Sequence, residues 1–380
     1  MGEKRKYTAR TFFNDLHLWL GLLSGIIIFL VCLSGTLLTY EEEIEALFSD
    51  KIKITAAGNA QNIEKLIAHV ETETKGKVTS VFIPSDKSEP QEYIVTLNPE
   101  ERRGTKVLVN PYNSQFVVPK KTFADDFMFV MFRLHRWLLF NSNIGRPIVG
   151  VATIIFLILS VTGIILWFPR KIKWKYLKQG FKIKTRANWK RINHDLHNTL
   201  GFYSCLLILI MGLTGLCWSF EDYRNLLSSA LGAKVFGERG KQEQLPSFST
   251  NNDKEISYVQ AIALANKHLN YSGDLRIVLP NSRNKNYTIS KLNDKKWTTI
   301  GFDVVTIDTY GRVLKSKFYE DIPLNEKIAS AIKPLHTGTI FGGISKLLYF
   351  FACLIATSLP VTGTIIWYHK LKKNKKWYLS

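Results

Sequence analysis

Four long apolar segments dominate the pattern of hydrophobic and polar positions along the 380-residue chain. A helix needs roughly 20 apolar residues to cross a bilayer, and each segment reaches that length. The first is too long for the core of a signal peptide and lacks a small-residue cleavage site, so we expect it to be retained. The predicted membrane helices lie near residues 18–40, 148–168, 198–220 and 344–368.

The stretches that follow the first and third apolar segments have the pattern of small α+β modules. Apolar residues at helical spacing predict one helix at 63–70 and another at 258–265. Alternating apolar and polar residues predict short strands around them. These strands are expected at 78–83, 92–97, 106–109, 276–279, 287–290, 297–302, 304–307 and 312–314.

The same order of residues occurs twice. The motif Asp-Leu-His opens the first apolar segment with His17 and, 180 residues later, the third segment with His197. A Leu-His pair precedes the other two segments, at His135 and His336. Each apolar segment therefore carries one histidine near its start. Both halves run in the same direction, which indicates two parallel repeats related by an axis along the membrane normal.

The net charge of +20 is concentrated in three short segments on one side of the predicted helices. The positive-inside rule places these segments, and with them both termini, in the cytoplasm. The modules between the helices then lie on the opposite, outer side of the membrane. Topology therefore accounts for the charge without a nucleic-acid partner. The basic segments are residues 1–10, 170–191 and 370–380.

Specific motifs add a resemblance to a known family. The membrane segments contain LHLWLG, LHNTLG, SVTGIILW and PVTGTIIW, and residues 305–314 read VTIDTYGRVL. With these motifs the chain resembles the PepSY-associated transmembrane family over nearly its whole length. That resemblance implies PepSY-like domains in the periplasm. It also implies the bacterial inner membrane, where members of the family include reductases that act on siderophore-bound iron.

The predicted fold class is a membrane α-helical protein with four transmembrane helices in two parallel repeats and two small α+β PepSY-like periplasmic domains. Eight segments follow from this prediction. They are the cytoplasmic N-terminus with the first membrane helix (1–40), the first periplasmic domain (41–133), an outer histidine segment with the second membrane helix (134–168), a basic cytoplasmic loop (169–197), the third membrane helix (198–220), the second periplasmic domain (221–335), an outer histidine segment with the fourth membrane helix (336–368) and a basic cytoplasmic tail (369–380).

Four histidines at membrane depth indicate a functional site, because buried ionisable side chains are costly there. Low-spin haem b takes two imidazoles from facing helices. The topology puts His17 and His197 at the inner side, and His135 and His336 at the outer side. We therefore predict two bis-histidine b haems, one near each membrane face. The chain lacks a Cys-x-x-Cys-His motif, so covalent c-type attachment is not expected.

Each apolar segment also carries a Ser/Thr-Gly pair. We expect Gly35 and Gly215 to border the outer haem, and Gly163 and Gly363 to border the inner one, where a flat macrocycle needs room. Packing between membrane helices is the alternative role for these glycines.

Other residues near the predicted sites are weaker candidates. His194 shares a helix face with His197 and could replace it, although the matching residue in the first half is asparagine. His369 is the other alternative for an inner iron ligand. Arg136, in a cluster with two further arginines, is expected to pair with haem propionates or to lie at a solvated interface.

The chain has no dinucleotide-binding glycine motif, so electrons must come from quinol or from a separate cytoplasmic reductase. These features predict an inner-membrane dihaem protein that carries electrons to the periplasm. The family resemblance implies that the acceptor is siderophore-bound Fe(III), so that the protein acts as a ferric-siderophore reductase. A redox relay to a periplasmic protein is one alternative. A PepSY module that binds or regulates a partner without redox chemistry is another.

Overall fold

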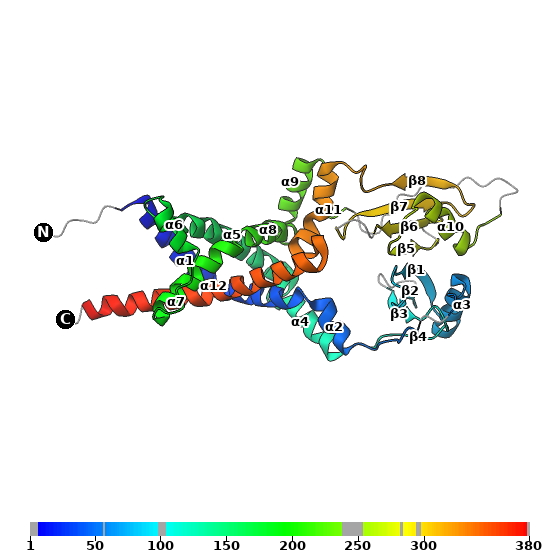
Figure 1. Cartoon of the computed structure of the whole chain (residues 1–380), viewed down its shortest axis with the longest axis horizontal. Helices are drawn as coiled ribbons and strands as arrows, with labels where there is room; N and C mark the ends of the chain where they lie inside the picture. Colours follow the sequence, from blue (N-terminus) through cyan, green and yellow to red (C-terminus); the bar gives the residue numbers. More distant parts are fainter. Residues whose placement is uncertain are drawn as a thin grey trace. The chain divides into compact units, whose positions relative to one another are not determined.

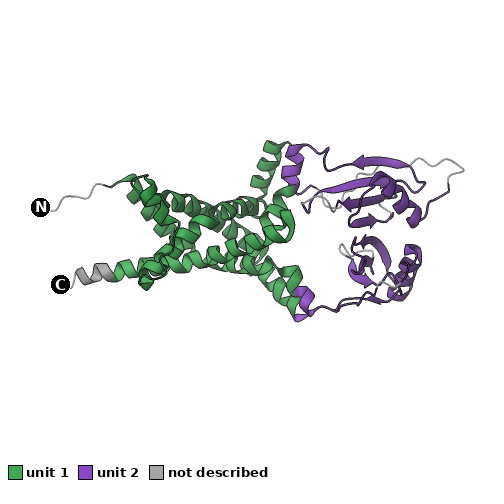
Figure 2. Cartoon of the chain, in the orientation of Figure 1, with its two compact units in different colours: residues 1–44, 124–235, 331–380 green, residues 45–123, 236–330 purple. Residues whose placement is uncertain are grey.

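The structure is a computed structural model that describes residues 7–55, 58–97, 104–237, 254–281, 284–293 and 298–377. The chain divides into two compact units, which Figure 2 distinguishes by colour. The helical unit comprises residues 1–44, 124–235 and 331–380, and the sheet unit comprises residues 45–123 and 236–330. Trp297, which was expected to begin a strand, lies outside the described residues.

Among the described residues, four helical segments of the helical unit are long and apolar enough to cross a membrane, which confirms the predicted number. The first of these helices exposes large apolar residues, as expected for a surface that faces lipid. Leu23 and Ile26 are 77% and 78% exposed. The chain is thus a multi-pass membrane protein. The segments are α1 (Ala9–Leu38), α5 (Ser142–Trp167), the continuous run of α7 (Trp189–Asp195), η1 (Leu196–Leu200) and α8 (Gly201–Ser219), and α12 (Gly342–Trp377) (Figure 1).

The four long helices form a closed arrangement in which each contacts two others, in the order α1, α5, α8, α12 and back to α1. Small residues permit the helices to pack closely against one another. A Cβ added at Gly212 of α8 would lie only 2.7 Å from the Leu157 side chain of α5. Glycine packing of this kind is common between membrane helices.

Two of the four histidines lie on separate helices that precede the membrane helices. His135 is on α4 (Phe123–Trp137), and His336 is on α11 (Leu324–Thr337). Left-handed backbone at Leu138 and Leu139 ends α4 before α5. Gly338 does the same after α11, and the short 3₁₀ turn η2 (Thr339–Phe341) leads into α12. His135 and His336 thus precede the second and fourth membrane helices, as their Leu-His pairs do in the sequence, and lie on two helices that were not predicted.

Three further helices were not predicted. The helices α2 (Glu41–Phe48) and α9 (Glu221–Leu231) follow α1 and α8, and each has acidic residues in its first turn. Carboxylates are favourable there because they meet the positive end of the helix dipole. The third, α6 (Trp174–Gly180), lies in the basic segment between α5 and α7.

The sheet unit contains one antiparallel sheet in the order β4-β3-β2-β1-β5-β6-β7-β8. The strands of the two chain segments join where β1 pairs with β5, from Ser80 opposite Val278 to Ile83 opposite Leu275. The strands of the two predicted α+β modules therefore lie in one continuous sheet. The strands are β1 (Lys77–Ile83), β2 (Gln91–Thr96), β3 (Thr105–Val109), β4 (Phe116–Val117), β5 (Leu275–Val278), β6 (Tyr287–Leu292), β7 (Phe302–Ile307) and β8 (Val313–Lys317).

A single hydrophobic core underlies this sheet. Two helices, α3 (Ile63–Thr74) and α10 (Tyr258–His268), contact each other and bury apolar residues against the strands. Both helices were predicted. The strand expected at 297–302 is wrong over its described residues, because residues 299 and 300 form a turn and only Phe302 belongs to β7.

Candidate functional site

The structure brings the four histidines of the helical unit together as two pairs. In the first histidine pair, His17 on α1 faces His197 on η1, with ring centroids 6.2 Å apart and ring planes at 90°. In the second histidine pair, His135 on α4 faces His336 on α11, with centroids 6.1 Å apart and planes at 55°. These are the partners that the predicted topology puts on the same side of the membrane.

The spacing of both pairs fits two imidazoles that share one metal ion. An imidazole nitrogen lies about 2 Å from a bound metal and the ring centroid about 1 Å further back, so two opposed rings have centroids about 6 Å apart. The observed 6.2 and 6.1 Å meet this requirement. No hydrogen bond joins the two described rings of either pair.

Hydrogen bonds of the first pair fix which ring nitrogen is free. The Nδ1–H groups of His17 and His197 donate to the Oγ1 atoms of Thr162 and Thr362, each at 2.9 Å. Each threonine hydroxyl donates its own hydrogen to a helix carbonyl four residues earlier, so it can only accept from the ring. Nε2 of each histidine is therefore left with a lone pair, which is the state that binds a metal.

The second pair reaches the same state through the backbone. His135 Nδ1 donates to the Val31 carbonyl at 2.8 Å, and His336 Nδ1 donates to the Met211 carbonyl at 2.9 Å. Thr214 Oγ1 lies 3.2 Å from the same nitrogen of His336. A carbonyl oxygen is only an acceptor, so both rings carry their hydrogen on Nδ1 and leave Nε2 free.

Each predicted glycine lies against an imidazole of the pair expected for it. A Cβ added at Gly35 or Gly215 would lie 3.0 Å from Cε1 of His135 or His336. Added at Gly163 or Gly363, it would lie 3.4 or 3.2 Å from Cε1 of His17 or His197. The glycines therefore make room for the histidine rings themselves. Room for the flat macrocycle beside the same glycines stays a prediction.

A cavity of about 990 Å³ adjoins the first pair, and His17, His197, Gly163 and Gly363 are among the residues that line it. Ligand sites typically have volumes of about 300–1,000 Å³, so this cavity is large enough for a cofactor. Basic side chains also line it, including Arg170 and Lys370.

Arg10 shows how the basic side of this cavity is held. Its guanidinium donates to the carbonyls of Leu166 and Phe168 at the end of α5, at 2.7 and 2.8 Å. The charge is therefore fixed beside the cavity. Anionic groups of a ligand would be favourable at this position.

Arg136 brings positive charge to the second pair. Its guanidinium lies over the rings of Phe132 and Trp137, at 5.3 and 5.4 Å from their centroids. Burial, with a contribution from Arg146, lowers the pKa of Arg136. Among the described residues no carboxylate pairs with it, and the buried Nε1 of Trp137 has no hydrogen-bond acceptor. Both observations fit an anionic partner, one of the two roles that the sequence leaves open for Arg136.

The two alternative histidines are not part of either pair. The side chain of His194 is 54% exposed, and its Nδ1 lies 3.6 Å from the Asp195 carboxylate, although it does line the cavity. His369 packs against Tyr368, with ring centroids 6.1 Å apart. Among the described residues neither ring stacks on a paired histidine.

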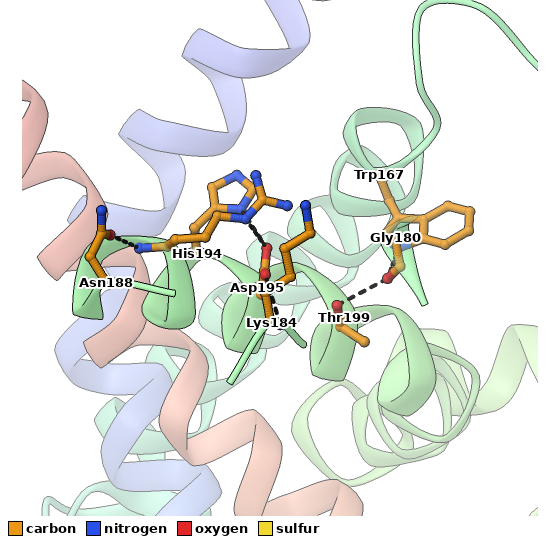
Figure 3. Close-up of polar contacts among 8 residues, drawn as sticks. Trp167, Gly180, Lys184, Asn188, His194, Asp195 and Thr199 are labelled. Atoms are coloured by element: carbon orange, nitrogen blue, oxygen red, sulfur yellow. Dashed lines mark hydrogen bonds and ion pairs between the residues drawn. The ribbon is translucent and has the colours of Figure 1, made fainter. Parts of the chain in front are cut away.

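A polar cluster ties the basic segment after α5 to the helix that carries His197, as Figure 3 shows. The buried Asp195 carboxylate pairs with Arg191 Nε at 2.8 Å and accepts from the Lys184 amide at 3.2 Å. The Gly180 carbonyl accepts from Trp167 Nε1 and Thr199 Oγ1. These bonds fix the basic segment after α5 against the helical residues next to His197.

His197 differs from His17 in its local backbone. It lies in the π-helical turn η1, whereas His17 lies in regular α-helix. π-Helical turns are rare and occur mostly as single turns inside α-helices, frequently at functional sites. The shared motif did not predict this difference. It also did not predict that the threonines of the Thr-Gly pairs hold the rings, although their position beside the glycines was visible.

The family model described as the PepSY-associated TM region matches residues 15–370, which is nearly the whole chain. Both histidine pairs lie within the matched residues. A comparison with curated proteins finds no match.

Proposed function

The chain belongs to the family of the PepSY-associated TM region, and from this membership and its two histidine pairs we propose that it is a b-type dihaem electron-transfer protein. The observation that carries the proposal is the geometry of the pairs. Both have the centroid spacing of two imidazoles on one iron, and all four rings leave Nε2 free.

In this proposal His17 and His197 hold one haem, and His135 and His336 hold the other. Haem bound by two histidines supplies one-electron transfer without covalent attachment. The chain's part is to bind, orient and charge-balance the group. Arg10, fixed beside the cavity, and Arg136, beside the second pair, would face the haem carboxylates.

The direction of electron flow follows from topology, which is also part of the proposal. We infer the bacterial inner membrane, cytoplasmic termini, a periplasmic sheet unit and two parallel repeats. The basic segments support this orientation by the positive-inside rule. The first pair is then near the cytoplasm and the second near the periplasm. The electron donor would be quinol or a separate cytoplasmic reductase.

Siderophore-bound Fe(III) is the proposed electron acceptor, so the activity would be that of a ferric-siderophore reductase. The family resemblance supports this substrate class. Hard oxygen ligands hold Fe(II) less tightly than Fe(III), so the transfer of one electron would release the iron. The sheet unit would hold the complex, while the helical unit would supply the electron.

The first experiment is the visible spectrum of the detergent-purified protein, oxidised and then reduced with dithionite, with haem quantified per chain. Two low-spin b haems per chain are expected. His17→Ala and His336→Ala should each remove one haem, whereas the matched control His194→Ala should keep both. A colourless protein from haem-replete cells would overturn the proposal.

Reduction of a ferric siderophore is tested separately, with the dithionite-reduced protein mixed anaerobically with a ferric hydroxamate and a ferrous chelator. Rapid haem reoxidation with formation of the ferrous complex is expected. A dihaem protein that is not reoxidised would instead favour electron relay to a periplasmic protein.

A further inference from the structure

Each of the four paired histidines contacts an equivalent position on a neighbouring helix, beside the glycine of a Ser/Thr-Gly pair. His135 and His336 donate to the carbonyls of Val31 and Met211, which lie four residues before Gly35 and Gly215. The carbonyls of Leu159 and Leu359 interact with His17 and His197, and they lie four residues before Gly163 and Gly363. The spacing between carbonyl and glycine is thus identical at all four positions.

Helix geometry explains this spacing. Side chains in an α-helix lean back over the preceding turn, so the side chain of one residue covers the carbonyl four positions earlier. Glycine leaves that carbonyl open on the helix surface. An imidazole that approaches the glycine can therefore reach an oxygen that other residues would shield. The short Cβ distances of 3.0–3.4 Å show how closely each ring has approached.

The residue before each glycine then distinguishes His135 from the other three histidines. At the first pair, Thr162 and Thr362 place their hydroxyl oxygens 2.9 Å from Nδ1 of the ring. At the second pair, the Ser34 hydroxyl donates to the carbonyls of Leu30 and Val31, and no hydrogen bond joins it to His135. The hydroxyl is thus a direct ring partner at both histidines of the first pair and, through Thr214 at 3.2 Å, at His336, but not at His135.

We propose that the glycines of the four Ser/Thr-Gly pairs admit the imidazoles to the helix backbone, and that Thr162 and Thr362 are positioning residues that set the tautomer and ring plane of His17 and His197. This inference rests on the proposed function, because it concerns how the rings present Nε2 to iron. The glycine leaves a backbone carbonyl accessible to the imidazole, and the threonine hydroxyl fixes the ring by accepting a hydrogen bond from Nδ1. The two ring planes of the first pair are thereby held at 90°, against 55° at the second pair.

Two measurable properties follow from this arrangement. A hydrogen bond accepted from Nδ1–H makes an imidazole a stronger donor to the metal, which favours the ferric state. The low-spin ferric EPR signal depends on the angle between the two imidazole planes. The two sites should therefore give two distinct low-spin signals, and loss of the threonine hydroxyls should alter only one of them.

The test uses the full-length holoprotein with Thr162→Val and Thr362→Val, alone and combined. The matched control is Ser34→Ala, which removes a hydroxyl at the same motif position that does not touch a ring. The double variant should change one of the two EPR signals and raise one of the two midpoint potentials. Ser34→Ala should change neither. Thr162→Ser with Thr362→Ser restores the hydroxyls and should return both values toward wild type.

The outcomes separate this inference from the proposed function. If wild type binds two haems but the valine variants keep both signals and both potentials, the threonines do not position the rings and the inference fails alone. If the valine variants lose one haem and the serine variants regain it, the inference stands, because a general folding defect would affect both sites. If wild type binds no haem, the inference falls with the proposed function.

Discussion

At the residue scale, the tolerance for an added methyl group differs sharply among glycines of the same helix. Gly35→Ala would put a Cβ 3.0 Å from Cε1 and 3.2 Å from Nδ1 of His135, closer than side-chain carbons normally approach. Gly21→Ala on the same helix would place its Cβ 3.8 Å from Leu159, which is an ordinary contact. We expect Gly35→Ala to displace His135 and to lower haem content from two per chain to one.

The control variant sharpens that measurement. Gly21→Ala should retain two haems and should stabilise α1 slightly, because alanine in a helix is favoured over glycine by about 0.5–1 kcal/mol. Pyridine haemochrome assays and thermal unfolding in detergent measure both quantities. Equal haem content in the two variants would show that the close contact at Gly35 has no role.

The sequence predicted which histidines form pairs, because the topology of the chain decides this. It did not predict which atoms hold each ring, because this depends on the rotation of each helix about its axis. Which histidines meet follows from the direction in which each segment crosses the membrane. Which atom holds each ring depends on the angle at which Thr162 and Thr362 face their neighbours. The apolar pattern of a membrane helix contains little rotational information, because nearly every face is apolar. The role of the threonines therefore does not follow from the sequence pattern.

At the scale of elements, the ends of helices depend on polar contacts that short motifs do not specify. Asp15 and Asp195 stand two residues before their histidines in the same motif, yet their environments differ. The Asp195 carboxylate is 4% exposed and pairs with Arg191, whereas the Asp15 carboxylate accepts from the exposed Tyr7 hydroxyl. The surrounding chain, not the motif, determines what each aspartate does.

This contrast predicts unequal effects of the same substitution. Asp195→Asn removes the charge that holds Arg191 and weakens the bond to the Lys184 amide. Loss of a buried charged partner should cost about 1–3 kcal/mol. The basic segment should then be cleaved faster by trypsin at low protease concentration. Asp15→Asn, at the exposed contact, should leave the cleavage rate close to wild type, and equal acceleration in both would contradict the role of the cluster.

The single sheet was the element that local pattern could not predict. Each strand has a recognisable alternation, but the pairing of β1 with β5 joins segments almost 200 residues apart, and no turn motif specifies it. We expect the sheet unit to unfold as one body, because its buried residues form one core. Ile277→Ala, at a fully buried position of β5, should cost about 2–4 kcal/mol.

Hydrogen exchange of the full-length protein checks this prediction. The Ile277→Ala change should speed exchange in β2 and β6 alike, since these strands flank β1 and β5. Thr306→Ala, on the less buried face of β7, is the matched control and should affect neither. Faster exchange in β6 alone would mean that the two chain segments fold independently.

At the scale of the whole molecule, the position of charge is the strongest argument for orientation. The segments 1–10, 170–191 and 370–380 hold nearly all of the net charge of +20, and the four helices alternate in direction between them. Orientation decides which histidine pair is near the electron donor and which is near the acceptor. It is therefore the property on which the direction of the proposed reaction depends.

Single cysteines introduced outside the membrane helices test this orientation. Lys87→Cys lies in the exposed β1–β2 loop, and Lys178→Cys lies in the exposed helix α6. The four native cysteines lie within the membrane helices, where burial and lipid protect them from polar reagents. A membrane-impermeant maleimide should label Lys87→Cys in intact spheroplasts, and should label Lys178→Cys only after permeabilisation. The opposite pattern would reverse the orientation, and with it the direction of electron transfer, because the first pair would then be the one near the periplasm.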